Sequence, residues 1–88
     1  MIEYVNEYLG TMILIFIIFS TDNWIAIGAT LGFCKLFGGG LYNPASAFAH
    51  NYANRLNDCD LLIYIIVEIL GAITAFIIYS QFFLNDAN

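Results

Sequence analysis

The stretch GGGLYNPASAFAH, residues 38–50, interrupts a chain whose other long segments are apolar. It brings together three glycines, an Asn-Pro pair and a histidine. Asn is a good helix N-cap, and Pro is favoured at the first helical position. We therefore predict that Asn43 caps a short helix, which begins at Pro44 and ends among the polar residues 51–57.

The composition around this stretch predicts a membrane protein made of a single domain, residues 1–88. Apolar residues make up 61% of the 88 residues and charged residues only 10%, whereas about a quarter of the residues in a soluble domain are charged. A soluble fold of this length could not bury so much apolar surface. The lipid bilayer is therefore the first expected partner.

The charges and the remaining reactive residues exclude several other functions. The formal net charge is −5, and Lys35 and Arg55 are the two basic residues, so nucleic-acid binding has no electrostatic basis. Cys34 and Cys59 do not have a metal-ligand spacing, and no disulfide between them is expected. With no nucleophile–base pair, phosphate loop or metal cluster in the sequence, we predict no enzyme activity, no metal and no cofactor.

Three apolar segments, residues 4–19, 24–37 and 61–84, predict three transmembrane helices. The second would cover only about 21 Å at 1.5 Å per residue, less than the roughly 30 Å hydrocarbon core. Residues 38–52 after it allow two arrangements. They form either a surface loop with an interfacial helix, or a re-entrant loop whose half-helix starts inside the bilayer. Irregular backbone is tolerated at that depth only where protein buries it or where it lines a watery cavity.

Four motifs, in order along nearly the whole chain, resemble those of the major intrinsic protein family, the aquaporins and glycerol facilitators. They are Glu7-Tyr-Leu-Gly10-Thr11, Gly28 in the second span, Gly38–Ala45 with its Asn-Pro-Ala, and Tyr64-Ile-Ile-Val-Glu68-Ile-Leu-Gly71-Ala72. Proteins of that family contain two inverted repeats. The resemblance implies an all-α membrane protein equivalent to one repeat, with three transmembrane helices and one re-entrant Asn-Pro-Ala half-helix.

The resemblance also implies a channel subunit that passes water or small neutral solutes. The implied pore-lining residues are Gly40, Leu41, Tyr42, Asn43, Pro44, Ala45 and Ser46. Backbone carbonyls of the first three would accept hydrogen bonds from the solute. The Asn43 amide and the positive end of the half-helix would disfavour cations. Trp24 and Ile27, near the outer end of the second span, are the candidates for the selectivity filter.

Two carboxylates and four small residues have predicted supporting roles. Glu7 either accepts backbone N–H groups of the re-entrant loop or lies solvated at the interface. Glu68 lies well inside the third span and is either protonated or hydrogen-bonded to the loop, as the family's Gln is. A proton relay would need a second ionisable group, and none is evident in the spans. The residues expected at close helix contacts are Gly28, Gly32, Gly71 and Ala75.

One repeat cannot enclose a pore of the family type, so a partner is expected. The simplest is an inverted second copy, giving an antiparallel dimer for each pore and eight chains in a tetramer of pores; the alternative is a second half-channel protein. Lys35 and Arg55 weakly place the N-terminus and the mouth of the loop in the cytoplasm.

A second function is also compatible with the sequence. Ser46 stands where the family's second repeat has the filter Arg, and the second span is short. Both features favour a non-conducting structural protein of an organelle or virus-particle membrane.

Overall fold

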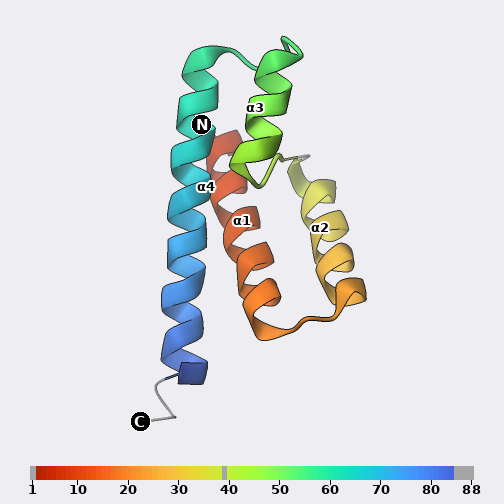
Figure 1. The fold of residues 1–88 in the computed structure, drawn as a ribbon, viewed down its shortest axis with the longest axis vertical. Helices are drawn as coiled ribbons and strands as arrows, with labels where there is room; N and C mark the ends of the chain where they lie inside the picture. The colour runs from red at the N-terminus through yellow and green to blue at the C-terminus, as the bar shows by residue number, and fades with distance from the viewer. Residues whose placement is uncertain (1, 39, 85–88) are drawn as a thin grey trace.

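The computed structural model describes residues 2–38 and 40–84, and these form helices with no strand among them (Figure 1). The helices are α1 (Ile2–Ser20), α2 (Trp24–Gly38), α3 (Pro44–Tyr52) and α4 (Asp58–Tyr79), and a π-helical turn (Ser80–Leu84) extends α4. The predicted all-α class is confirmed for this part of the chain. Residue 39, in the predicted re-entrant loop, and residues 85–88 lie outside the described residues.

Asparagine side chains begin three of the helices. The Oδ1 atom of Asn23 accepts the N–H groups of Ile25 and Ala26 at 2.9 and 3.1 Å at the start of α2. Asn57 caps α4 in the same way. Asn43 caps α3, and Pro44 is its first residue, so the predicted short helix is confirmed. These side chains supply acceptors for backbone donors that have no partner within the helix.

Two segments are long and apolar enough to cross a membrane, judged by length and composition: Ile2–Ser20 and Asp58–Phe83. The second predicted span appears as a shorter apolar helix, because the 15 residues of α2 reach only about 22 Å. Only 17% of the apolar window of each long helix is buried within the chain. The outward faces therefore need lipid or another chain to cover them.

The two long helices pack against each other through small residues. Ala75 is fully buried, and a Cβ at Gly71 would lie 2.7 Å from the carbonyl oxygen of Tyr8. On the same side, the hydroxyl groups of Tyr8 and Thr74 are 2.7 Å apart. Both residues predicted for helix packing in the third span thus lie at the contact between α1 and α4.

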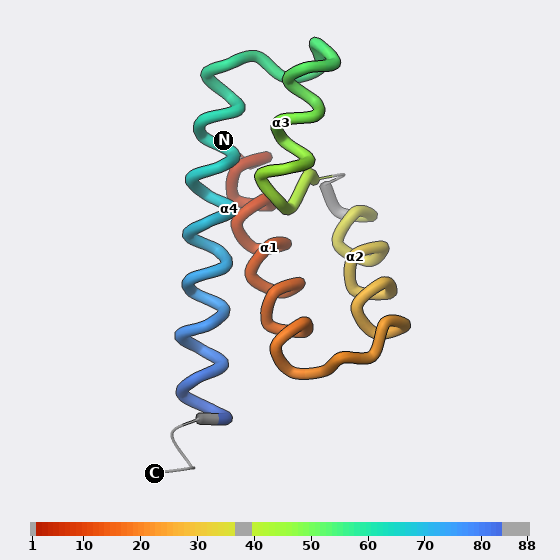
Figure 2. The backbone as a smooth tube through the Cα atoms, in the orientation of Figure 1, coloured from red at the N-terminus to blue at the C-terminus, as the bar shows by residue number. Residues whose placement is uncertain are grey.

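The other two helices, α2 and α3, follow one another along the long axis of the molecule (Figure 2). In the tube view, α2 lies along α1, and the backbone then crosses to the start of α3, which continues away from α2 along the N-terminal part of α4 (Figure 2). Residues 40–43, the described part of the connection between them, are irregular. This part of the connection lies against α1, where Glu7 accepts the N–H groups of Leu41 and Tyr42.

The contact at Gly71 gives a test of the helix pair. Gly71→Ala places a methyl group against the Tyr8 backbone, which a flexible side chain cannot relieve, so we expect a loss of about 1–3 kcal/mol in thermal unfolding in detergent micelles. Gly28→Ala is the matched control, because no atom lies within 4 Å of its added Cβ. Equal stability of the two variants would contradict this packing.

Candidate functional site

Glu7 holds the connection between α2 and α3. Its side chain is 1% exposed, and its carboxylate accepts the N–H of Leu41 at 3.0 and 3.1 Å to its two oxygens and also accepts the N–H of Tyr42. Hydrogen bonds to an ionised acceptor are the stronger kind. Of the two environments predicted for Glu7, the structure has the one in contact with the loop rather than the solvated one.

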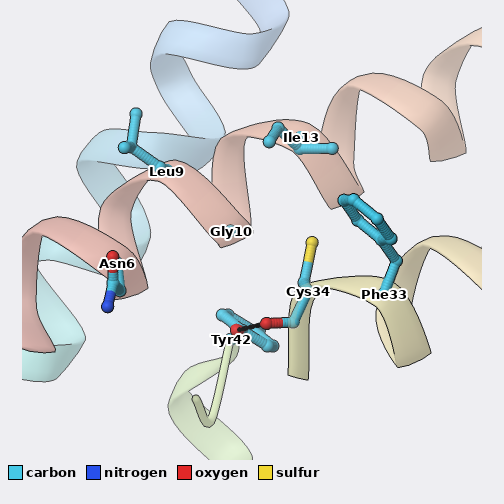
Figure 3. A pocket seen from close by; sticks show the side chains of 7 residues that line it. All are labelled: Asn6, Leu9, Gly10, Ile13, Phe33, Cys34 and Tyr42. Atoms are coloured by element: carbon cyan, nitrogen blue, oxygen red, sulfur yellow. Dashed lines mark hydrogen bonds between the residues drawn. The ribbon is translucent and has the colours of Figure 1, made fainter. Parts of the chain in front are cut away.

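Tyr42 locks the same connection from the other side. Its backbone has φ of 63°, an uncommon conformation for a residue other than glycine, and its side chain is 3% exposed. The ring lies beside Gly10 of α1, and its hydroxyl donates to the carbonyl of Cys34 in α2 at 2.8 Å (Figure 3). A Cβ at Gly10 or Gly40 would collide with this ring. The tyrosine thus joins the connection to both α1 and α2.

An apolar cavity of about 260 Å³ lies beside this ring. It is lined by Asn6, Leu9, Gly10, Ile13, Phe33, Cys34 and Tyr42 (Figure 3). Cys34 is 6% exposed and has a free thiol, as has Cys59, which is exposed. The Cys34 thiol therefore reports on whether Tyr42 stays in place.

Asn43 and the first turn of α3 come directly after Tyr42. The Oδ1 atom of Asn43 accepts the N–H of Ser46 at 2.9 Å. Its Nδ2 hydrogens are still available as donors, and the side chain is exposed. Pro44 and Ser46 are half-buried and Ala45 is exposed. The positive end of the α3 dipole lies here, beside a surface that the chain itself leaves uncovered.

Two of the carbonyl groups before Asn43 have side-chain hydroxyl or ammonium groups of the same chain beside them. Lys35 Nζ donates to the carbonyl of Gly40 at 2.9 Å and lies 5.8 Å from the centre of the Tyr42 ring. The carbonyl of Tyr42 lies 3.5 Å from the Oγ1 of Thr11. Sequence reasoning missed Lys35 here and used it only as a topology signal. Its place in the last turn of α2, five residues before Gly40, is the feature that brings it within reach.

Glu68, the second predicted supporting carboxylate, is 1% exposed. Neither of its oxygens has a hydrogen-bond partner among the described residues, so the predicted bond to the loop is not found there. Glu68 lies one turn before Gly71, which packs against Tyr8, and therefore at the level of Glu7 in α1. The sequence offered no second ionisable group for Glu68, because Glu7 comes near it only after α1 and α4 pack together.

A polar cavity of about 210 Å³ reaches Glu7 from the side of α3. Its lining residues are Glu3, Glu7, Gly40, Leu41, His50, Arg55, Leu56 and Tyr64. The ring of His50 is hydrogen-bonded to the carbonyl of Ser46 at 2.8 Å and is half-buried. The cavity joins the Glu7 carboxylate to the polar connection between α3 and α4.

The two filter candidates lie apart from this site. Trp24 is 79% exposed at the start of α2, whereas the Gly40–Asn43 segment follows the end of that helix. Ile27 is one turn further along and half-buried. Gly28 and Gly32 also face open space within the chain. The roles of these four residues stay predictions, because they concern contacts with a solute or a second chain.

Comparison with known proteins gives an informative match. Glycerol uptake facilitator protein-like 6 of Lactiplantibacillus plantarum is 34% identical over 86 residues, which cover 83% of this chain and 40% of that protein. The chain thus spans less than half the length of this relative. No protein-family model matches the chain, and no solved structure matches it. The match supports a relationship to the group of proteins that the four motifs resemble.

Replacing the anchoring carboxylate tests the site. Glu7→Gln weakens the bonds to Leu41 and Tyr42, so we expect Tyr42 to leave its cavity more often. In a Cys59→Ser background, Cys34 should react with a small alkylating reagent about tenfold faster, for a loss of about 1.4 kcal/mol. Asp22→Asn, an exposed carboxylate between α1 and α2, is the control. Unchanged alkylation in Glu7→Gln would show that this carboxylate does not hold the segment.

Proposed function

We propose that the chain is a half-length channel subunit of the aquaporin and glycerol-facilitator type, which passes water or small neutral solutes once it is paired. The observation that carries the proposal is the Gly40–Asn43 segment, which leads into a capped half-helix and is held by a buried carboxylate. The motifs of this segment and the similarity to the glycerol uptake facilitator-like protein point to the same family.

Depth along α1 supports a position inside the bilayer for this segment. Thr11 is the middle residue of α1, and its hydroxyl lies 3.5 Å from the carbonyl of Tyr42. Glu7 is four residues away from that middle, about 6 Å along the axis. If α1 spans the bilayer, the backbone before Asn43 lies within about 6 Å of the midplane. The nine residues of α3 then cover about 14 Å back towards the N-terminal face.

The second span takes a different form in this proposal from the one predicted. In place of a complete helix followed by a descending loop, α2 crosses from the far face only to the level of the Gly40–Asn43 segment. There α3 begins and completes the crossing. Such discontinuous spans place helix ends and irregular backbone at the centre of transport proteins. In this arrangement Asn43 places polar groups inside the apolar hydrocarbon core of the bilayer.

The chemistry of this point suits neutral solutes. Asn43 offers amide donors, and the first turn of α3 offers the positive end of a helix dipole. Donors with positive potential disfavour cations and allow water or a hydroxyl group to pass. One such half-helix does not enclose a pore. We therefore propose an antiparallel dimer for each pore, with eight chains in a tetramer of pores, or pairing with a second half-channel protein.

The second candidate function, a non-conducting membrane scaffold, rests on one contact. The ammonium group of Lys35 donates a hydrogen bond to the carbonyl of Gly40. In the channel proposal this carbonyl would be the first acceptor for a solute. Ser46 in place of the filter Arg agrees with this alternative. The membrane concerned would then be that of an organelle or a virus particle.

Osmotic swelling separates the two functions. Liposomes holding the purified, oligomerised chain should swell several-fold faster than empty ones. Ala45→Trp should remove the increase, because it puts a bulky ring at the exposed first turn of α3. Phe48→Trp, also exposed on α3 and one turn away, is the matched control and should still conduct. Swelling no faster than that of empty liposomes favours the scaffold.

Labelling of Cys59 determines the pairing. Cys59 is exposed at the start of α4, so a membrane-impermeant maleimide reaches it from one side only in any given copy. An inverted homodimer predicts that about half of the copies are labelled from each side of sealed vesicles. Cys59→Ser controls for reaction at Cys34. Labelling from one side alone would exclude the homodimer and leave the second half-channel protein.

A further inference from the structure

We propose that Glu7 and Glu68 together form a binding site for one proton, in which a neutral Glu68 donates a hydrogen bond to the Glu7 carboxylate. Such a site belongs to the fold of the chain itself and exists whether or not the chain conducts.

Both carboxyl groups are buried. Each side chain is 1% exposed, and they are the largest fully buried side chains of the described residues. They come from different helices, α1 and α4. The rings of Tyr4 and Tyr64 are 5.2 Å apart and Gly71 packs against Tyr8, so Glu68, between Tyr64 and Gly71, lies level with Glu7. Two buried carboxyl groups at the same level of neighbouring helices are unfavourable if both are negatively charged.

Hydrogen-bond donors are supplied unequally to the two groups. Glu7 accepts the N–H groups of Leu41 and Tyr42, so its oxygens have backbone donors. Glu68 receives none from the described residues. A buried carboxylate without donors is very unfavourable, and a second negative charge beside it makes it more so. Between two carboxylates a hydrogen bond needs a proton, so one proton placed on Glu68 lets it donate a hydrogen bond to Glu7.

The surrounding charged and titratable groups are compatible with this assignment. Tyr64 of α4 and Glu3 of α1 lie near the pair, and Tyr42 lies on the loop side. Lys35 donates to the Gly40 carbonyl and so serves the loop rather than the pair. His50 and Arg55 line the polar cavity beyond Glu7. The proton therefore lies between Glu7 and Glu68. His50 and Arg55 lie on the other side of Glu7, in the polar cavity.

The polar cavity gives the proton a route. It extends from Glu7 to the region of His50 and Arg55, at the end of α3. A proton that leaves Glu68 passes to the Glu7 carboxylate and from there to the solvent in this cavity. The pair then carries two negative charges instead of one. Repulsion pushes Glu7 away from Glu68, which strains the bonds that hold Leu41 and Tyr42.

Infrared spectroscopy of the full chain in vesicles of ether-linked lipids, which have no ester carbonyl band of their own, tests the site. Exposed carboxyl groups are ionised at neutral pH, so the C=O stretch of a protonated carboxyl at pH 7 reports a buried one. We expect this band in the wild type, its loss at alkaline pH, and its absence in Glu68→Gln. Asp58→Asn, an exposed carboxylate in the first turn of α4, is the control and should keep the band. No band at pH 7 in the wild type, or an unchanged band in Glu68→Gln, would overturn the proposal.

Alkylation of Cys34 provides a second readout. In Glu68→Gln the introduced amide donates to Glu7 at every pH, so this variant should keep Tyr42 in place throughout. In a Cys59→Ser background, the reactivity of Cys34 should rise with pH severalfold more in the protein that retains Glu68 than in Glu68→Gln. Both proteins share the titration of the thiol itself, so their difference isolates the carboxyl pair. Identical pH profiles in the two proteins would also count against the proton site.

Discussion

The hydrogen bonds from Leu41 and Tyr42 to the Glu7 carboxylate are the constraint on which the rest of the structure depends. They fix an irregular segment of backbone between two short helices that cannot fix it themselves. Because the segment is held at the second turn of α1, α2 must end there and α3 must begin there. A single buried carboxylate therefore sets the position of two helices.

Around this anchor, close packing depends on glycine residues, which have no side chain to keep their neighbours apart. Gly10 and Gly40 leave the space that the Tyr42 ring fills, and Gly71 lets α4 approach the backbone of Tyr8. Tyr42 in turn links α1 to α2 through the carbonyl of Cys34. The four helices thus form one unit through a few polar contacts and small residues, although only 17% of the apolar window of each long helix is buried. This is how helices associate when lipid, rather than water, surrounds them.

The sequence predicted the parts of this arrangement that follow from local chemistry. Asn43 and Pro44 carry a cap signal that depends on neighbouring residues only, and the long apolar segments identify α1 and α4 directly. The role of the Tyr42 side chain had no such signal, because tyrosine rarely adopts a positive φ and its partners are distant in sequence. The pairing of Glu68 with Glu7 was missed for a similar reason. It depends on the register of α1 against α4, which a pattern of apolar residues does not specify.

The shortness of α2 has a consequence for how the chain enters a membrane. A helix inserted alone leaves its last carbonyl groups without partners, and those of a 15-residue helix would end in hydrocarbon rather than in the head groups. The Tyr42 hydroxyl donates to the Cys34 carbonyl near the end of α2, but only after the connection has docked on α1. Insertion helix by helix is therefore unfavourable for α2. If the chain spans a bilayer, we expect α2 to enter together with α3, as one interrupted span that meets α1 already in place.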